Sequence, residues 1–339
     1  MDPGIASLVW DELARAGATA RAVAVAIRAR GETESAAFVR PGAGVALAAD
    51  APFVLYSITK TFLAAAALRL VSRGLLELDV GVGRWLPWAP HGERITLRHL
   101  LQHTSGLPDY GPLAAYHAAV RAGEAPWTDA EFLERTGAST LRSVPGVEFR
   151  YSNIGYLLVR RLLESAAGAP LGEVLQAELL APLALHETFT PTDADLPRLT
   201  FGPSALLGDG APRGVAGHYH LGWVAHGVLA STAGDVARFL EALLGGELLP
   251  PALVSELCAL REVGPVARQH PFRRPGYGLG LMGELDGDTL GHTGGGPGAS
   301  TATYRRGRAT VAVLTSGDQD DLAEQLAMAL LARAVPARG

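Results

Sequence analysis

The chain has 339 residues, of which 48% are hydrophobic, and a formal net charge of −5 at pH 7. This length and apolar content indicate a globular protein of about two domains with a sizeable core. Charges of both signs are interspersed, which argues against nucleic acid as a partner. The single cysteine, Cys258, excludes an internal disulfide.

Apolar runs are interrupted before they reach membrane-spanning length, so we expect no membrane partner. The first ten residues carry an early acid, Asp2, and no basic region of the kind that opens a signal peptide. We therefore expect a cytoplasmic protein, unless a leader has been removed. The oligomeric state is left open.

The first predicted elements are a short helix and a pair of strands. Residues 5–16 form an amphipathic pattern that ends at Gly17. Residues 20–31 alternate apolar and polar side chains with the period of a strand, and residues 35–42 offer a partner after a turn at Gly31.

The middle of the chain is mainly helical. Thr96, Thr128 and Thr232 occupy positions typical of helix N-caps, and Glu131 completes a capping box with Thr128. Residues 153–168 form a further amphipathic helix, closed by a glycine.

Strand patterns return near the C-terminus. Two strands are expected around Asp286–Gly287, and residues 299–317 predict a hairpin that turns at Arg306–Gly307. Residues 321–335 predict a closing helix.

Strands at both ends predict one antiparallel sheet built from both termini and flanked by helices. The predicted class is α/β plus all-α. Residues 1–60 and 216–339 would form the α/β domain and residues 61–215 an inserted, mainly helical domain, with the active site at their interface.

One short stretch, "FVLYSITKTFLAAAALRL", stands out chemically. Of 29 basic residues, 28 are arginines, and the single lysine is Lys60, three residues after Ser57. This spacing places both side chains on one face of a helix, and the residues from Thr61 to Leu68 predict a fully buried helix. A partly desolvated lysine can lose its proton and activate a hydroxyl, which arginine cannot do. S-x-x-K alone, however, occurs by chance in many proteins.

Two further motifs follow. "YSN" places Tyr151, Ser152 and Asn153 at the start of a helix, and "GHTGGG" ends a predicted strand with glycines that suit the close approach of a substrate backbone. Each alone has an ordinary interpretation: a packed tyrosine, or a flexible loop with a structural histidine.

Taken in order, S-x-x-K, Y-S-N and H-T-G resemble the serine β-lactamase and penicillin-binding-protein superfamily. The tyrosine form resembles the class C-like branch, with its esterases and D-peptidases. Other segments agree, among them "ITLRHLLQHTSGLPDY" and "GVLASTAGDVARFL", so that the resemblance runs from about residue 20 to residue 330.

The resemblance implies a role for each matching residue. Ser57 would be the nucleophile that forms an acyl-enzyme. Lys60 and Tyr151 would shuttle its proton, with Tyr151 as the base toward Ser57 and toward the deacylating water. The backbone N–H groups of Ser57 and Gly295 would form the oxyanion hole.

The resemblance also implies the residues that line the substrate cleft. Asn153 would bond the acyl side of the substrate and help to orient Lys60. The other implied substrate-binding residues are His292, Thr293, Gly294 and, at the rim, Trp223 with His226.

A histidine at position 292 bears on the substrate class. The family pattern most associated with β-lactams has lysine there, whose ammonium helps to hold a carboxylate. Histidine is mostly neutral near pH 7, so neutral esters or amides are favoured. We expect a carboxylesterase that acts on small acyl esters. A β-lactamase, a D-amino-acid peptidase or amidase, and a biosynthetic acyltransferase stay open. A penicillin sensor without turnover is disfavoured, because such sensors usually need a membrane segment.

No cofactor or metal is expected. His218 and His220 could suggest a metal, but no H-E-x-x-H motif or cysteine cluster supports one, and a polar loop is the simpler interpretation. The usual α/β-hydrolase is excluded because the chain has no G-x-S-x-G motif. The expected partner is a small ester, amide or lactam.

Overall fold

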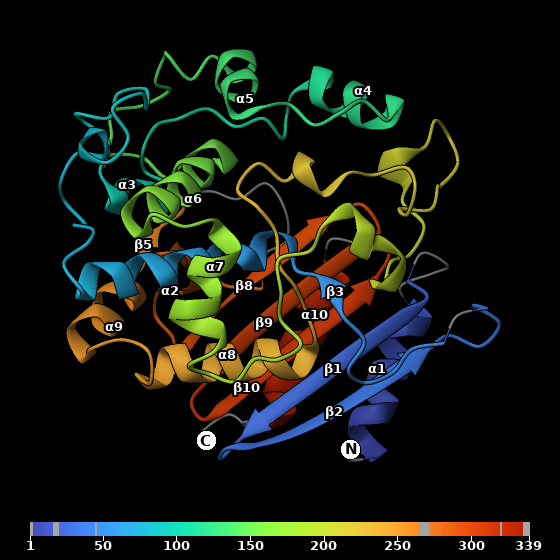
Figure 1. Ribbon diagram of the computed structural model, residues 1–339. Helices are drawn as coiled ribbons and strands as arrows, with labels where there is room; N and C mark the ends of the chain where they lie inside the picture. The colour runs from blue at the N-terminus through green and yellow to red at the C-terminus, as the bar shows by residue number, and fades with distance from the viewer. Residues whose placement is uncertain (1–2, 16–19, 45, 265–270, 319–320, 335–339) are drawn as a thin grey trace.

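The computed structural model describes residues 3–15, 20–44, 46–264, 271–318 and 321–334 (Figure 1). The last predicted residues of the first and closing helices, and the predicted end at Gly17, lie outside these ranges.

An eight-stranded antiparallel sheet runs through the molecule, and strands from the two ends of the chain pair within it (Figure 1). The last long strand pairs with the first, Ala24 facing Leu314 and Ala26 facing Ala312. The predicted hairpins are confirmed: the pair next to the turn is Ala29 with Glu32 in the first hairpin and Arg306 with Ala309 in the second. The order across the sheet is β2 (Glu32–Val39), β1 (Ala22–Ala29), β10 (Ala309–Ser316), β9 (Ala299–Arg306), β8 (Thr289–Gly296), β7 (Met282–Glu284), β6 (Pro275–Tyr277) and β5 (Arg261–Glu262).

Helices cover both faces of this sheet because its strands carry small or branched apolar residues in alternation. Val23 and Val311 belong to the face that packs against α1 (Pro3–Arg15) and α10 (Leu322–Ala334). The opposite face, which includes Ala24, packs against α8 and the helices beyond it.

The remaining helices lie mostly on that second side (Figure 1). Their predicted N-caps are confirmed: Thr128 Oγ1 accepts the backbone N–H of Glu131 at 3.3 Å, and Thr232 Oγ1 accepts that of Asp235 at 3.2 Å. The helices are α2 (Thr59–Ser72), α3 (Leu97–Leu101), α4 (Ala114–Ala122), α5 (Asp129–Thr136), α6 (Asn153–Ala167), α7 (Leu171–Leu175), α8 (Ala233–Gly245) and α9 (Pro251–Cys258).

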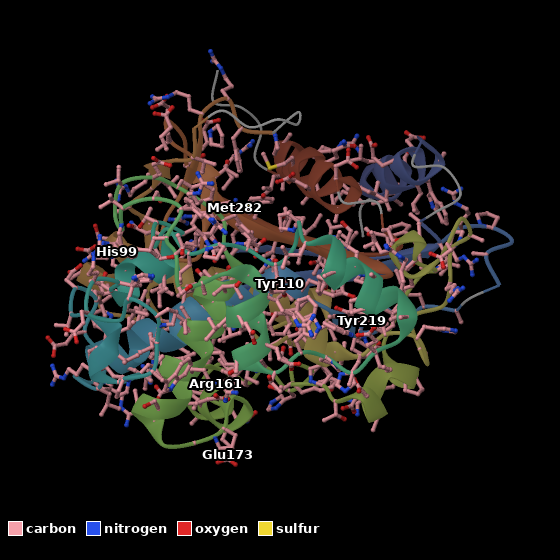
Figure 2. All side chains as sticks on the ribbon, turned by 90° about the horizontal axis from the view of Figure 1, so that it is seen from above. His99, Tyr110, Arg161, Glu173, Tyr219 and Met282 are labelled. Carbon is pink, nitrogen blue, oxygen red and sulfur yellow. The ribbon has the colours of Figure 1, made fainter. Side chains whose placement is uncertain are left out.

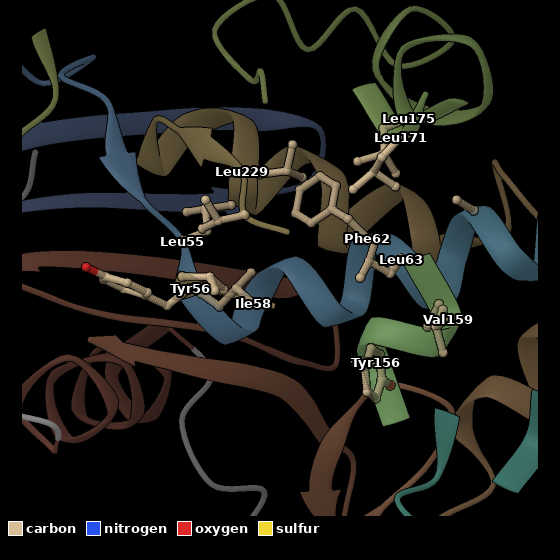
Figure 3. Close-up of a cluster of buried hydrophobic side chains, with 14 of the residues drawn as sticks. Leu55, Tyr56, Ile58, Phe62, Leu63, Tyr156, Val159, Leu171, Leu175 and Leu229 are labelled. Carbon is tan, nitrogen blue, oxygen red and sulfur yellow. The ribbon is translucent and has the colours of Figure 1, made fainter. Parts of the chain in front are cut away.

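Helix α2 is the centre of the core. Every residue from Thr59 to Leu68 is buried, as the uncharged sequence predicts. Figure 3 shows Phe62 of α2 near Leu171 and Leu175 of α7, and α6 alongside α2. A helix packed on all sides holds its first turn rigidly, and that turn carries Lys60.

The hydrophobic core is continuous between the sheet and the helices, since one cluster of buried side chains contains residues of β1, α2, α6 and α8. The division of the chain into two domains stays a prediction. Within the described ranges, no helix has both the length and the apolar character needed to cross a bilayer.

Candidate active site

Ser57 lies in a single 3₁₀ turn, Tyr56–Ile58, that leads directly into α2. Tyr56 has a φ of +46°, a backbone conformation that a bulky residue adopts only when its surroundings hold it. Its hydroxyl donates to the carbonyl of Pro297 at 2.6 Å, and the N–H of Leu55 donates to Leu229 at 2.8 Å. The strained turn therefore presents Ser57 from a fixed position.

Lys60 lies one turn further along, and its ammonium nitrogen is directed back at the serine. Lys60 Nζ lies 2.9 Å from Ser57 Oγ, and the lysine side chain is fully buried. Burial lowers the pKa of Lys60 to about 7, although the negative charge of Asp109 raises it in part. A substantial fraction of Lys60 is thus neutral near pH 7 and can accept a proton.

Tyr151 also contacts Ser57. Its hydroxyl lies 2.9 Å from Ser57 Oγ. Burial raises the pKa of Tyr151 above its ordinary value, and the hydrogen bond with Ser57 opposes this only in part. Tyr151 therefore carries its proton at neutral pH, and Lys60 is the better resting base of the two.

The loop before α6 aims Tyr151. Ser152 caps α6 by accepting the N–H of Gly155 at 3.0 Å, and its hydroxyl donates to Pro108 at 2.7 Å. The backbone N–H of Ser152 donates to Nδ1 of His103 at 3.1 Å, and the ring of His103 lies against that of Tyr151, with centroids 4.2 Å apart.

Asn153, the first residue of α6, lines the cavity in front of Ser57. Its side-chain amide donates to Asp109 at 3.3 Å. In the part of the chain that the structure describes, Lys60 Nζ has hydrogen bonds with Ser57 and His226 and none with Asn153. The expected help of Asn153 in orienting Lys60 stays a prediction, and in this structure its amide bonds Asp109, whose charge acts on Lys60.

Strand β8 runs beside the turn that carries Ser57, and the glycines of β8 allow the two segments to lie close together. A Cβ on Gly294 would lie 2.2 Å from the carbonyl oxygen of Leu55 and 2.9 Å from the backbone nitrogen of Ser57. Thr301 Oγ1 links the two segments, lying 3.1 Å from that same Leu55 oxygen and 3.2 Å from the Gly294 oxygen. Gly295 lines the cavity together with Ser57, as an oxyanion hole built from their N–H groups requires.

The cavity in front of Ser57 is small, about 150 Å³, and largely aromatic. Among the described residues, no aspartate, glutamate, lysine or arginine lines it. Figure 2 locates Tyr110 and Tyr219, which contribute to its wall from separate loops. The remaining lining residues include Tyr56, Tyr116, His117, Asn153, Val224, His226 and Gly296.

His292 of β8 is fully buried, and its side chain is absent from the wall of this cavity. Its Nε2 lies 2.9 Å from the hydroxyl of Tyr277, and its Nδ1 lies 2.5 Å from the carbonyl oxygen of Thr293. Burial, with the charge of Lys60, lowers the pKa of His292 to about 3. His292 is thus a buried, neutral group, and its expected place on the strand side of the cleft stays a prediction. Thr293 also lies outside the cavity wall, and its hydroxyl faces the sulfur of Met282.

Trp223 does not line the Ser57 cavity either. It is buried in an aromatic cluster with Tyr116, Trp127 and Phe132, and the Tyr116 ring separates it from the cavity. Trp223 instead lines another cavity, of about 470 Å³, beside His220, which pairs with Asp193 at 2.7 Å. The role of Trp223 at the substrate rim stays a prediction.

Three residues contact the Ser57 site in ways that the sequence did not predict. Asp109 and His103 lie in "HTSGLPDY", where a histidine and an acid before a tyrosine give no spacing that singles them out. His226 was expected only at the rim, but its Nε2 lies 3.3 Å from Lys60 Nζ. These contacts join distant segments, so local patterns do not predict them.

The geometry matches a known family. The sequence matches the family described as Beta-lactamase over residues 10–334. This chain belongs to the β-lactamase family. The antiparallel sheet with flanking helices is the β-lactamase/transpeptidase-like fold, as both the sequence and the solved structures show.

Relatives in this family carry several activities in their names. A penicillin-binding protein of Bacillus subtilis (strain 168) is 29% identical over 293 residues, which are 80% of this chain and 62% of the relative. Esterase EstB of Burkholderia gladioli is 29% identical over 282 residues, 71% of this chain and 68% of the esterase. The chain thus spans about two thirds of the length of these curated relatives.

A solved structure matches over nearly the whole chain. The D-stereospecific amidohydrolase from a Streptomyces species has a TM-score of 0.82 and 27% sequence identity, and the match covers 95% of this chain and 97% of that protein.

Proposed function

We propose that this chain is a serine hydrolase of the β-lactamase family that forms an acyl-enzyme on Ser57 and hydrolyses small, uncharged acyl esters. One observation carries the proposal: Ser57 Oγ lies 2.9 Å from both Lys60 Nζ and the Tyr151 hydroxyl. A nucleophile flanked by a neutralised base and a second proton carrier is the arrangement that covalent acyl transfer needs.

Neutral Lys60 accepts the proton of Ser57 as Oγ attacks the acyl carbon. The N–H groups of Ser57 and Gly295 stabilise the oxyanion. When the bond to the alcohol breaks, the proton returns from Lys60 to the leaving oxygen, with Tyr151 as the relay. Water then attacks the acyl-enzyme, gives its proton to the same pair, and releases the acid and free Ser57. This assigns the base to Lys60 rather than to Tyr151.

The cavity supports a small and neutral acyl group. Its volume of about 150 Å³ has room for a short chain, and its aromatic wall offers no ionic partner to a charged one. His292 adds no cation, because burial and the positive charge of Lys60 lower its pKa and keep it neutral.

A second candidate is the hydrolysis of D-amino-acid amides. It is favoured by the structural match to a D-stereospecific amidohydrolase, which covers 95% of this chain at 27% sequence identity. The same acyl-enzyme chemistry serves both substrates. A β-lactamase, a D-peptidase and an acyltransferase are further outcomes that one assay panel separates.

The test begins with the nucleophile. A phosphonate or an activated ester should add a single adduct to the intact protein by mass spectrometry, and Ser57→Ala should abolish it. Labelling that persists on another serine in Ser57→Ala would remove the mechanism.

The panel then compares p-nitrophenyl butyrate, a chromogenic cephalosporin and D-amino-acid amides by kcat/KM. We expect the butyrate ester to be turned over much faster than the cephalosporin. A D-amide hydrolysed faster than its L-isomer and than the ester would select the second candidate. A cephalosporin that matches the ester would select the lactamase.

A further inference from the structure

His226 touches the catalytic lysine although it lies far from it in the sequence. It follows the turn Leu221–Trp223 and precedes the short strand β4 (Ala230–Ser231). Its side chain is 2% exposed, lines the Ser57 cavity and places Nε2 3.3 Å from Lys60 Nζ. Lys60 Nζ is therefore held between Ser57 Oγ and an imidazole nitrogen.

The two hydrogen-bond partners of Lys60 Nζ have different roles: His226 accepts a hydrogen bond from Nζ, whereas the Ser57 hydroxyl can donate one to it. A protonated lysine has three N–H donors and no acceptor, so its contact with His226 requires an unprotonated Nε2. Neutral Lys60 has two N–H bonds and one lone pair. When one N–H is donated to His226, the lone pair can be directed to the hydroxyl hydrogen of Ser57.

We infer that His226 is a positioning residue for the catalytic base: its Nε2 accepts a hydrogen bond from Lys60 in both protonation states and aims the lysine lone pair at Ser57. This inference rests on the proposed function of Ser57. A neutral acceptor suits this role, because it supports the ammonium that forms during the reaction without holding it permanently charged, as a carboxylate would.

In the described part of the chain, Lys60 Nζ has two hydrogen-bond partners, Ser57 Oγ and His226 Nε2. His226 is therefore the one neutral acceptor other than Ser57. Asp109 acts on Lys60 through its charge, and the rings of Tyr151 and Tyr156 lie 5.0 Å and 5.6 Å from Nζ. The other titratable or charged groups that act electrostatically on this cluster are His103, His292 and Arg160.

The second nitrogen of His226 bears on its tautomer. Nδ1 is buried, and the backbone of Tyr56, beside Ser57, acts on the imidazole as a hydrogen-bond acceptor. In the tautomer that accepts from Lys60, Nδ1 carries the hydrogen. A backbone acceptor near the ring favours that tautomer, which leaves Nε2 available to accept from Lys60.

Three substitutions test the role through the rate at which a phosphonate labels Ser57, measured against pH. His226→Leu removes the acceptor. Labelling should slow by about 10- to 100-fold, the effect of one hydrogen bond to a charged group. The acid limb of the pH profile of labelling should move to lower pH, because the Lys60 ammonium loses a hydrogen-bond acceptor and its pKa falls. His226→Gln keeps a neutral acceptor and should keep the limb in place. His226→Glu adds a carboxylate and should move the limb to higher pH.

A matched control is Thr310→Val. Thr310 in β10 is buried and lies outside the site. Thr310→Val should leave the rate of Ser57 labelling and its dependence on pH unchanged, whereas His226→Leu should slow labelling.

Unchanged labelling and an unchanged limb in His226→Leu would overturn the inference. If His226→Leu does not fold, an unshifted limb in His226→Glu would overturn it instead. The absence of any labelling of wild-type Ser57 would contradict the proposed function, which is a separate result.

Discussion

Asp109 holds Asn153 through both oxygens of its carboxylate. Oδ1 accepts the backbone N–H of Asn153 at 2.8 Å, and Oδ2 accepts its side-chain amide at 3.3 Å. A carboxylate at the first turn of α6 satisfies a free N–H group there and complements the helix dipole. The same negative charge raises the pKa of Lys60. Asp109 therefore connects the start of α6 to the protonation of the base.

Asp109→Asn should move the acid limb of kcat/KM to lower pH. The substitution keeps an acceptor for the backbone N–H of Asn153 but removes the negative charge, so Lys60 loses its proton more readily. Asp109→Ala should show the same shift and should also lose about 0.5–2 kcal/mol of stability, as the removal of a helix cap does. Activity measured against pH and urea unfolding check the two effects. An acid limb of kcat/KM that is unchanged in Asp109→Asn would show that the charge of Asp109 does not affect the pKa of Lys60.

Lys60→Arg should lose nearly all activity and still fold. Arginine keeps the positive charge but holds its proton at any working pH, so it cannot act as a base. General base assistance is typically worth about 10²–10⁴-fold in rate, and a loss of at least this size is expected in Lys60→Met as well. The methionine variant controls for the larger arginine head. Steady-state kinetics decide the matter, and a Lys60→Arg enzyme with a large fraction of wild-type kcat would contradict the base assignment.

The buried lysine should also give the protein a measurable dependence of stability on pH. The pKa of Lys60 falls from its ordinary 10.5 to about 7 on folding. Between these values the unfolded chain binds a proton that the folded chain does not, so the free energy of unfolding rises with pH. The slope from this residue approaches about 1.4 kcal/mol per pH unit. Lys60→Met should remove it.

Urea unfolding of both proteins between about pH 7.5 and 9.5 measures this slope. The difference in stability between wild type and Lys60→Met should change steadily in favour of the wild type as pH rises. A constant difference would mean that Lys60 keeps its ordinary pKa in the folded protein.

Gly294→Ala should disable the site without a change in any reacting group. The added methyl would lie 2.2 Å from the Leu55 oxygen, so β8 and the Ser57 turn must separate. Misplacement of this kind costs about 100-fold in rate. Gly234→Ala is the control, since its Cβ would meet only ordinary contacts near 3.6 Å in α8. It should retain activity and gain about 0.5–1 kcal/mol of stability. An active Gly294→Ala enzyme would show that this contact is not needed.

The sequence predicted those parts of the site that depend on short spacing. Ser57 and Lys60 lie one helical turn apart, and Ser152 caps the helix that follows Tyr151, so local rules place each pair. The sheet was predicted because the strand period at both ends is clear. The confirmed hairpin at Arg306–Gly307 carries the turn that its sequence indicates.

Contacts between distant segments were not predictable in this way. His226 meets Lys60 across 166 positions of sequence, and Asp109 meets Asn153 across 44. The side of β8 on which the His292 side chain lies is not predictable from the sequence either, because strand alternation indicates two faces but does not tell which of them faces the cavity. The same holds for Trp223, because neighbouring positions on a turn can line different cavities.

The pairing of β1 with β10 has a consequence for the order in which the protein can assemble. During synthesis β1 and β2 emerge first, but the strand that must lie beside β1 is among the last to be made. Until then β1 has an unpaired edge, which favours association with other chains. Strand β8, which supports the Ser57 turn, also comes late. A chain that stops before β8 would hold Ser57 and Lys60 without the strand that lies against their turn, so the candidate site is complete only when synthesis is nearly finished.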